Sequence, residues 1–323
     1  MPKVSVIIPV YGVEKYIEQC ATSLFEQTLD NIEFIFIDDC SLDNSISILR
    51  KVIDKYTLRL SEKNHIVRIE KMLMNSGQAA VRKHGLQLAT GSFIIHCDSD
   101  DWVEADMYRL MYERAVNEGS DVVICDYNNT DGKTISQTVK GCYSASKEQC
   151  FNDMLYHKIS WAVWNKLIKK DIYDSIECYP KFAMGEDMVL ISQAILNSKK
   201  ISYVEENLYN YYLNPTSIMN TQTERRCMDK FLQLKGNTEI LLPILNSKLD
   251  KKYCKKIERL LSYNTTITLF PYIHKREFFL LWKREMQPCY RILFDKNVKL
   301  IFKIMYLLVA FRIYSLYNYL KYA

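Results

Sequence analysis

The sequence predicts an α/β fold with a mainly parallel sheet, followed by a helical C-terminal extension. Short apolar runs rich in β-branched and aromatic residues alternate with helical patterns from Val4 to Cys125, whereas only helical patterns follow from about Thr221. Alternating strands and helices require right-handed crossover connections, which give parallel sheets covered by helices on both faces. Strands that are buried on both faces have continuous apolar runs, as these do.

The expected strands are the apolar runs themselves, at residues 4–10, 32–37, 66–72, 93–97 and 122–125. Between them, apolar residues recur at intervals of three and four, which is typical of helices that pack on one face. These helices cover residues 17–24, 46–53, 79–89 and 107–116, and the second begins after a capping residue, Ser41 or Asp43. The polar turn at 128–133 predicts that residues 134–139 pair back as an antiparallel strand.

Charge is distributed unevenly along this chain of 323 residues, whose net charge is +5. Residues 221–323 contain 20 Lys and Arg against 8 Asp and Glu, whereas residues 1–220 contain 23 against 30. This asymmetry predicts two regions with different roles, an acidic region at 1–220 and a basic helical region at 221–323. The 10 cysteines form no CxxC pair and no secretory segment opens the sequence, so we expect reduced thiols, no zinc site and a cytoplasmic location.

Three acidic clusters occur where such a fold would place its ligand site. They are Asp38-Asp39 and the run DSDD from Asp98, each after an expected strand, and Glu186-Asp187 before an apolar helix. Ligands of parallel sheets bind beyond the carboxyl ends of the strands. Any one cluster could simply cap the next helix. Three clusters at one edge would repel one another, which favours a bound cation or a role in proton transfer.

The DSDD run has the pattern of a divalent-cation site. Asp98 and Asp100 lie two residues apart at a strand end, where their carboxylates can share one Mg²⁺ or Mn²⁺ through hard oxygen ligands. A cation with few protein ligands completes its coordination with water and substrate phosphates. The expected chemistry is therefore the departure of a diphosphate, whose developing charge the cation neutralises.

Residues 1–220 resemble the family 2 glycosyltransferases, which have the GT-A (nucleotide-diphospho-sugar transferase) fold. Five stretches carry the resemblance in the family's order and spacing: VSVIIPVYGVEKYI, EFIFIDDCSLDNS, NSGQAAVRKHGLQLATGSFIIHCDSDDW, WNKL and GED. Gly12, Cys40 and Val81 depart from the residues usual in the family, but these departures remove no charged group. The resemblance implies an inverting transfer of a hexose or N-acetylhexosamine from a nucleotide diphosphate sugar, expected to be a UDP-sugar, to an acceptor hydroxyl.

The resemblance also implies roles at the nucleotide. Pro9, Val10 and Tyr11 would line the nucleoside pocket, and Asp39 would accept a hydrogen bond from the base. Arg82 would support the nucleotide site, although a purely structural ion pair is an equal alternative for this residue.

At the reacting end, the resemblance makes Asp98 and Asp100 the family's DxD pair. Asp100 would bind Mn²⁺ or Mg²⁺, and Asp98 would lie close to the ribose or the metal. Asp187 would be the general base that deprotonates the acceptor, with Glu186 as its neighbour. The implied acceptor is a saccharide or a lipid-linked oligosaccharide in surface-polysaccharide biosynthesis.

The basic C-terminal region has the composition of a membrane-surface segment. Residues 300–320 are mostly apolar but contain Lys303 and Arg312, and the uninterrupted stretch at 304–311 is far shorter than the roughly 20 residues that cross a bilayer. We expect a helix lying in the interface, so that the protein is peripheral on the inner face of the cell membrane. A helical lid over the active site is the alternative. Nucleic acid is not expected as a partner, because the acidic catalytic half would repel it.

Other functions fit the motifs less well. A sugar nucleotidyltransferase would need a Gly/Arg/Lys-rich loop after the first strand, which PVYGVEKY lacks, and no GxGxxG motif indicates an oxidoreductase. A non-enzymatic sugar- or membrane-binding module would not need both the DSDD and the GED clusters. His96, Trp161 and Trp164 are expected to pack in the core, with stacking on an acceptor sugar as a second role for the tryptophans.

Overall fold

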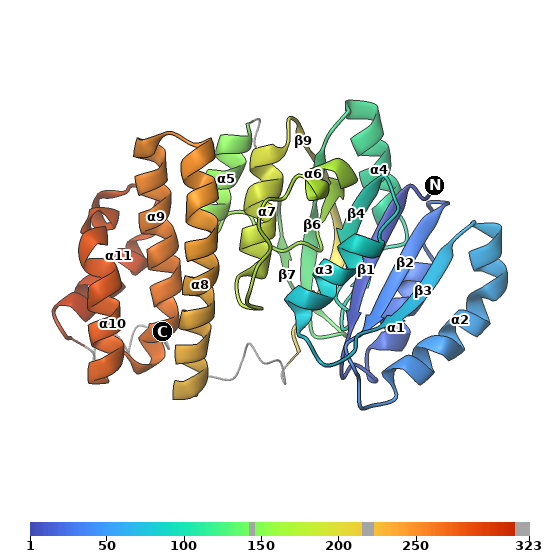
Figure 1. Ribbon diagram of the computed structural model, residues 1–323, viewed down its shortest axis with the longest axis horizontal. Coiled ribbons are helices and arrows are strands. Elements are labelled where there is room, and N and C mark those ends of the chain that lie inside the picture. The colour runs from blue at the N-terminus through green and yellow to red at the C-terminus, as the bar shows by residue number, and fades with distance from the viewer. Residues whose placement is uncertain (142–145, 215–222, 314–323) are drawn as a thin grey trace. The chain divides into compact units, whose positions relative to one another are not determined.

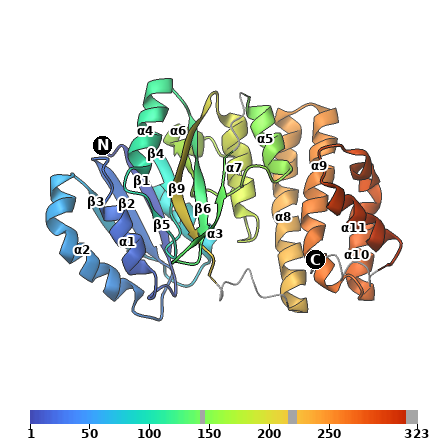
Figure 2. The same ribbon diagram turned by 180° about the vertical axis from the view of Figure 1, so that it is seen from behind.

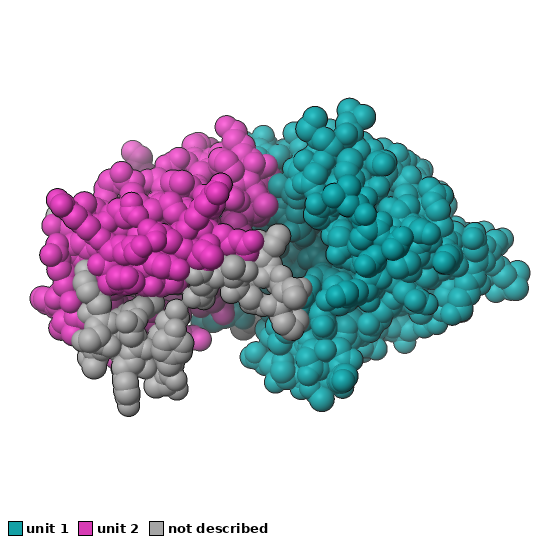
Figure 3. All heavy atoms as spheres, turned by 90° about the horizontal axis from the view of Figure 1, so that it is seen from below, with its two compact units in different colours: residues 1–154, 158–179, 186–215 teal, residues 155–157, 180–185, 216–323 magenta. Residues whose placement is uncertain are grey.

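The computed structural model describes residues 1–141, 146–214 and 223–313. It divides into two compact units, which Figure 3 distinguishes by colour. Unit 1 comprises residues 1–154, 158–179 and 186–215, and unit 2 comprises residues 155–157, 180–185 and 216–323. The predicted interfacial segment at 300–320 is described only as far as Ile313.

Unit 1 is an α/β domain (Figures 1 and 2). Its strands are β1 (Val4–Val10), β2 (Ile32–Asp38), β3 (Ile66–Lys71), β4 (Phe93–His96), β5 (Trp102–Val103), β6 (Val122–Thr130), β7 (Ile135–Val139), β8 (Lys166–Lys169) and β9 (Ile201–Tyr212). Its helices are α1 (Ile17–Phe25), α2 (Ser45–Glu62), α3 (Gln78–Leu88), α4 (Met107–Glu118), α5 (Lys147–Leu155), α6 (Lys170–Asp174) and α7 (Glu186–Asn197).

The strands form one sheet in the order β3-β2-β1-β4-β8-β6-β9-β5, with β7 paired to β6. The four strands from β3 to β4 are mutually parallel, as are β6 and β9. The predicted α/β class is therefore confirmed, and β7 pairs antiparallel to β6 as the turn at 128–133 predicted. The antiparallel strand β8 between β4 and β6 was not predicted, because four residues are too few to show a period.

The long strand β9 was also missed from the sequence. It contains the exposed Glu205 and Glu206, which lie where the β6–β9 register shifts between Cys125 and Asp126. Two extra polar residues at a bulge interrupt the apolar pattern that would have indicated a strand. The consequence for the site is that β9 carries Tyr209 and Tyr212 to the end of β4.

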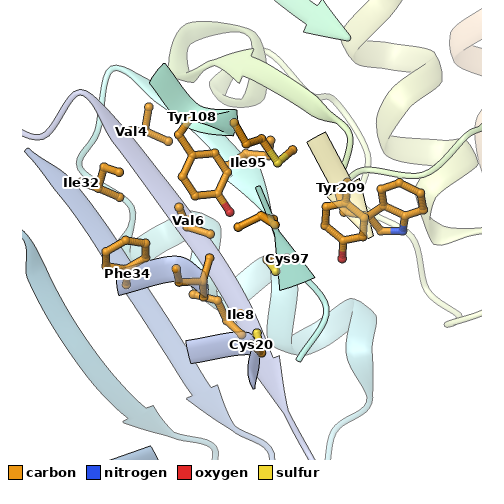
Figure 4. Close-up of a cluster of buried hydrophobic side chains, with 14 of the residues drawn as sticks. Val4, Val6, Ile8, Cys20, Ile32, Phe34, Ile95, Cys97, Tyr108 and Tyr209 are labelled. Atoms are coloured by element: carbon orange, nitrogen blue, oxygen red, sulfur yellow. The ribbon is translucent and has the colours of Figure 1, made fainter. Parts of the chain in front are cut away.

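The main core lies on one face of the sheet, against α1, α2 and α4. Figure 4 shows alternate residues of β1, including Val6 and Ile8, packed with Phe34 of β2 and Tyr108 of α4. The opposite face carries α3, as the two views in Figures 1 and 2 show. A Cβ on Gly85 would lie 2.4 Å from Ile7 Cγ2, so only glycine allows α3 to approach β1 this closely.

In unit 2, all secondary-structure elements of the described residues from Thr223 are helical, as the sequence predicted. Its elements are α8 (Glu224–Lys248), α9 (Lys251–Thr266), the 3₁₀ segments η2 (Ile267–Tyr272) and η3 (Gln287–Phe294), α10 (Arg276–Met286) and α11 (Leu300–Ala310). Its buried side chains include Phe231, Leu241, Ile257 and Phe278. Within the described ranges, every helix is too short or too polar to cross a bilayer.

Candidate active site

Arg82 joins two of the three acidic clusters. Its buried guanidinium donates from Nη2 to Asp98 Oδ1 at 2.6 Å and from Nη1 to Asp187 Oδ1 at 2.8 Å. Nη1 also donates to Glu186 Oε1. Of the three clusters predicted to share one edge of the sheet, two are thus joined by a single cation. Three carboxylates around one guanidinium leave a local excess of negative charge.

Three elements place these side chains together. Asp98 follows β4, while Glu186 and Asp187 are the first residues of α7. Carboxylates in the first turn of a helix are stabilised by its dipole. Arg82 lies on α3, which the close contact at Gly85 holds against β1, so its long side chain can reach both acidic segments.

Glu186 and Asp187 share a partner but differ in access to solvent. Burial raises the pKa of Glu186 to about 8, and the Arg82 charge acts in the opposite direction. Burial also raises the pKa of Asp187, again opposed by Arg82. The Glu186 side chain is only 5% exposed, whereas that of Asp187 is 26% exposed. Asp187 is therefore the more solvent-accessible of the two carboxylates.

The three aspartates of DSDD have separate environments. Asp101 is buried and accepts hydrogen bonds from the Tyr209 hydroxyl at 2.6 Å and from the Tyr212 backbone N–H at 2.7 Å, so it fixes β9 to the loop after β4. Burial and the Asp98 charge raise the pKa of Asp100 to about 6. Asp98 and Asp100 thus repel each other, and a cation between them would relieve that repulsion.

The residues present fit a divalent cation that binds together with its substrate. Asp98 Oδ1 accepts from Arg82 and from Gln78 Nε2 at 3.1 Å, which leaves the second oxygen of Asp98 and the carboxylate of Asp100 as hard ligands. Mg²⁺ sites commonly use one or two carboxylates plus substrate phosphates. In the part of the chain that the structure describes, no three His, Cys, Asp or Glu side chains form a closed metal site.

The first acidic cluster, Asp38-Asp39, does not bond Arg82 but accepts hydrogen bonds from backbone N–H groups of nearby loops. Asp38 Oδ1 accepts a hydrogen bond from the Ser41 N–H at 2.7 Å. This is the local capping role that any acidic residue at a strand end can have. The two oxygens of Asp39 accept from the N–H groups of Ser76 at 2.7 Å and Gly77 at 2.9 Å. Gly77 has a φ of 80°, which favours glycine, so Asp39 fixes the turn that begins α3.

The predicted nucleoside-pocket residues form the end of β1. Val10 is buried and its carbonyl accepts from the Asp39 N–H at 3.0 Å, so the ends of β1 and β2 are joined at this point. Pro9 is half-buried and Tyr11 is 52% exposed. Tyr11 is thus an exposed aromatic residue directly after β1, and Asp39 is a fixed carboxylate directly after β2.

His96 and Trp164 lie in the core. The His96 ring packs edge-on against Tyr173 at 5.9 Å, and burial together with the Arg82 charge holds its pKa well below the ordinary value. Trp164 is buried and stacks on Tyr209 at 4.2 Å. Trp161 is half-buried and contacts Phe151 edge-on at 5.8 Å.

The sequence did not single out Lys166, which lies near the candidate base. This side chain is fully buried and its Nζ donates to Ser160 O, Ala162 O and Asn165 Oδ1 at 2.7–2.8 Å. Burial lowers its pKa to about 8, and the Asp187 charge opposes that shift. The available signal was the lysine of WNKL, which precedes the apolar pair Leu167-Ile168, where a surface lysine would not be expected.

Comparisons with known proteins identify the family of this chain. Residues 5–178 match the family described as glycosyl transferase family 2. The chain is 29% identical over 276 residues to EpsH of Bacillus subtilis, covering 83% of this chain and 76% of EpsH. It is 28% identical over 215 residues to the poly(ribitol-phosphate) beta-glucosyltransferase of Bacillus spizizenii, covering 65% of this chain and 32% of that enzyme.

Two solved structures show the same fold at low sequence identity. The first is residues 1–349 of S. aureus TarS in complex with UDP-GlcNAc, with a TM-score of 0.66, 20% identity, and coverage of 90% of this chain and 81% of that chain. The second is the mannosyltransferase PcManGT of Pyrobaculum calidifontis in complex with GDP-Man and Mn²⁺, with a TM-score of 0.50, 14% identity, and coverage of 91% and 88%. The likeness to TarS identifies a GT-A-type fold, as the resemblance implied.

Proposed function

The chain belongs to glycosyl transferase family 2 and is a glycosyltransferase, and from this premise we propose that it transfers a hexose or N-acetylhexosamine from a UDP-sugar to an acceptor hydroxyl with inversion. One observation carries the proposal. The partly exposed Asp187 is held by the same buried Arg82 that holds Asp98 of the DxD pair. A base for the acceptor and a ligand set for the donor diphosphate are thereby fixed relative to each other.

Asp187 is the proposed general base. Its carboxylate accepts the proton of the acceptor hydroxyl while the oxygen attacks the anomeric carbon, and the bond from that carbon to the diphosphate breaks. An α-linked donor attacked from the opposite face gives a β-linked product. Arg82 donates to Asp187, so the orientation of this carboxylate is set before the acceptor arrives.

Asp98 and Asp100 are the proposed ligands of Mn²⁺ or Mg²⁺. The bound cation would neutralise the negative charge that develops on the departing diphosphate. Support comes from the mutual repulsion of the two carboxylates in unit 1 and from the Mn²⁺ named with PcManGT.

The nucleotide is proposed to bind at the ends of β1 and β2. Pro9, Val10 and Tyr11 would line the nucleoside pocket. Each oxygen of Asp39 accepts one backbone N–H and keeps capacity for a further hydrogen bond from the base. UDP is favoured because TarS is described in complex with UDP-GlcNAc.

The acceptor is proposed to be a saccharide or a lipid-linked saccharide in surface-polysaccharide biosynthesis. The chain is related to enzymes of polysaccharide and teichoic acid synthesis, one of which acts on poly(ribitol phosphate). Such acceptors are polyhydroxylated, which suits a reaction whose only demand on the acceptor is one hydroxyl within reach of Asp187.

We further propose that unit 2 binds the inner face of the cell membrane. Leu300, Leu307 and Phe311 lie at intervals of seven and four along α11 and its end, and are 71%, 40% and 71% exposed. The neighbouring Lys299 and Lys303 would face anionic headgroups. Leu308, which lies within the apolar stretch 304–311 that was predicted to enter the interface, is instead buried.

The decisive experiment measures UDP binding and transfer together. Isothermal titration should show UDP affinity that depends on Mn²⁺ or Mg²⁺, and a panel of UDP-sugars with saccharide acceptors should release UDP. Nuclear magnetic resonance of the product should show a β-anomer. Absence of metal-dependent nucleotide binding would contradict the proposed cation site, and an α-linked product would contradict the inverting mechanism.

A further inference from the structure

The DSDD motif forms a single tight turn after β4. The Cys97 N–H donates to Ile7 O at 3.0 Å and so continues the ladder between β4 and β1. The next three peptide units turn back, because the Asp101 N–H donates to Asp98 O at 3.1 Å. A bond from the carbonyl of the first residue to the N–H of the fourth closes a β-turn. Both proposed cation ligands, Asp98 and Asp100, therefore belong to this one turn.

One side-chain hydroxyl, that of Tyr209, bonds both ends of the DSDD turn. It accepts from the Asp98 N–H at 3.1 Å and donates to Asp101 Oδ2 at 2.6 Å. A tyrosine hydroxyl has one donor and free lone pairs, so the two bonds use it in both roles at once. The other oxygen of Asp101 accepts from the Tyr212 N–H at 2.7 Å, so β9 holds the far end of the turn at two points.

The ring that carries this hydroxyl has a fixed position. Tyr209 is fully buried and stacks on Trp164, with the ring centroids 4.2 Å apart and an interplanar angle of 13°. Figure 4 shows the Tyr209 ring beside the end of β4, where Cys97 leads into the turn. The residue after Trp164 is attached to β6, because Asn165 Nδ2 donates to Cys125 O at 2.9 Å. The hydroxyl is thus placed at the turn by the sheet itself.

We propose that Tyr209 is a positioning residue for the cation site: its hydroxyl holds both ends of the DSDD turn, so that Asp98 and Asp100 keep the spacing that Mn²⁺ or Mg²⁺ requires. The inference rests on the proposed role of these two aspartates as ligands. Mg²⁺ demands nearly ideal octahedral geometry, so two ligands on a loosened turn bind it less well. Tyr209 touches neither the cation nor the substrate and acts only through the turn.

The test is Tyr209→Phe, which keeps the ring on Trp164 and removes only the hydroxyl. The gain in UDP affinity on adding Mn²⁺, measured by isothermal titration, should fall about 10-fold, the effect of one hydrogen bond to a charged group. UDP affinity in EDTA should stay within about twofold, which separates an effect on the cation site from a general loss of structure. An undiminished effect of Mn²⁺ in Tyr209→Phe would overturn the proposal.

The matched control is Tyr108→Phe. Tyr108 is as buried as Tyr209, but its hydroxyl has no hydrogen-bond partner in the part of the chain that the structure describes. The same chemical change there should leave UDP affinity unaltered with and without Mn²⁺. If both variants lose the effect of Mn²⁺ equally, the loss comes from disturbing the core and the positioning role of Tyr209 is wrong.

Hydrogen exchange examines the turn without any ligand. The Asp98 amide loses its acceptor in Tyr209→Phe, so a peptide that contains the DSDD turn should exchange faster than in the wild-type protein, while peptides of β2 keep their rate. Unaltered exchange at the turn would show that the hydroxyl does not hold it, and the proposal would fail. If UDP affinity of the wild-type protein does not depend on Mn²⁺ or Mg²⁺, the proposed cation site itself is wrong and the inference falls with it.

Folding of each variant is checked by circular dichroism and thermal unfolding. Tyr209→Phe leaves the buried Asp101 with one donor fewer, so its melting temperature should be lower than that of Tyr108→Phe. If Tyr209→Phe does not fold, combining it with Asp101→Asn removes the buried charge and still leaves the Asp98 N–H without its acceptor. This double variant should fold and show the same selective loss. If neither folds, the hydroxyl serves folding alone and the proposal fails.

Discussion

Arg82 and Asp187 are 105 positions apart in the sequence, yet Nη1 of the arginine donates to Oδ1 of the aspartate at 2.8 Å. The same guanidinium bonds Asp98, so one buried cation couples the proposed base to the proposed metal ligand. This dual attachment explains why an arginine is suited to the position. Its planar fork can hold carboxylates on two sides, whereas a lysine offers a single charged point.

Replacing Arg82 should destabilise the protein strongly. Arg82→Met leaves Asp98 and Asp187 without their shared cation and the buried Glu186 without its hydrogen-bond donor, and we expect the free energy of unfolding to fall by about 3–5 kcal/mol in urea denaturation. The matched control is Arg114→Met, which removes an exposed pair with Glu118 and should cost less than about 1 kcal/mol. Similar losses in the two variants would contradict the central role of Arg82.

Removing the base should affect turnover rather than donor binding. Asp187→Asn keeps the size of the side chain but cannot accept the acceptor proton, so kcat should fall by roughly 10²–10⁴. UDP affinity, measured by isothermal titration, should be nearly retained. Asp174→Asn changes an exposed carboxylate and is the control. A loss confined to UDP binding would reassign Asp187 to the nucleotide site.

The rate should depend on pH in the direction set by Asp187. The base acts as the carboxylate, and burial raises its pKa above the ordinary value of 3.8. Activity should therefore be complete at higher pH and be lost as the pH falls through this raised pKa, giving an acid limb of kcat above pH 3.8. The profile of Asp187→Asn should lack this limb. If Asp187→Asn keeps an acid limb at the same pH, that limb belongs to the titration of another group.

The DxD pair gives a prediction about the cation. Asp100→Ala removes one of two hard ligands, so transfer should be abolished and the gain in UDP affinity on adding Mn²⁺ should disappear. Asp106→Ala, on the exposed start of α4, is the control. Undiminished Mn²⁺-dependent binding in Asp100→Ala would exclude this residue as a ligand.

The sequence predicted those parts of the structure that a continuous apolar run or an acidic motif indicates. Apolar runs such as that of β1 identified the parallel half of the sheet, and DSDD and GED identified the carboxylates. It could not show that Arg82, rather than a metal, joins Asp98 to Asp187, because that contact depends on the close packing of α3 at Gly85. Nor could it separate the buried Asp101 from its neighbours.

Lys166 and the strand β9 show a second limit of prediction from the sequence. The lysine is held by backbone carbonyls, and backbone geometry has no residue code that can be read from the sequence. The strand is interrupted by Glu205 and Glu206 at a bulge, where polar residues imitate a loop. In both cases long-range packing, and not local propensity, decides the structure.

The exposed stripe of α11 makes membrane binding testable without shortening the chain. Truncation before α11 would remove Tyr306 and Leu308, which are buried in unit 2, and would confuse loss of binding with loss of folding. The double variant Leu307→Ser with Phe311→Ser instead changes two exposed side chains. Each should lose about 1 kcal/mol of burial in the interface, or roughly 30-fold in partitioning to anionic liposomes for the pair.

Sedimentation with vesicles containing anionic lipid measures this loss, and the wild-type protein should be partly released at high salt because the attraction of Lys299 and Lys303 to headgroups is screened. The control is Leu58→Ser on α2, which removes an apolar side chain that is 73% exposed on unit 1 and should leave vesicle binding unchanged. UDP binding should be intact in all variants, since the proposed nucleotide residues lie in unit 1. Equal sedimentation of wild-type protein and the double variant would mean that α11 does not contact the membrane.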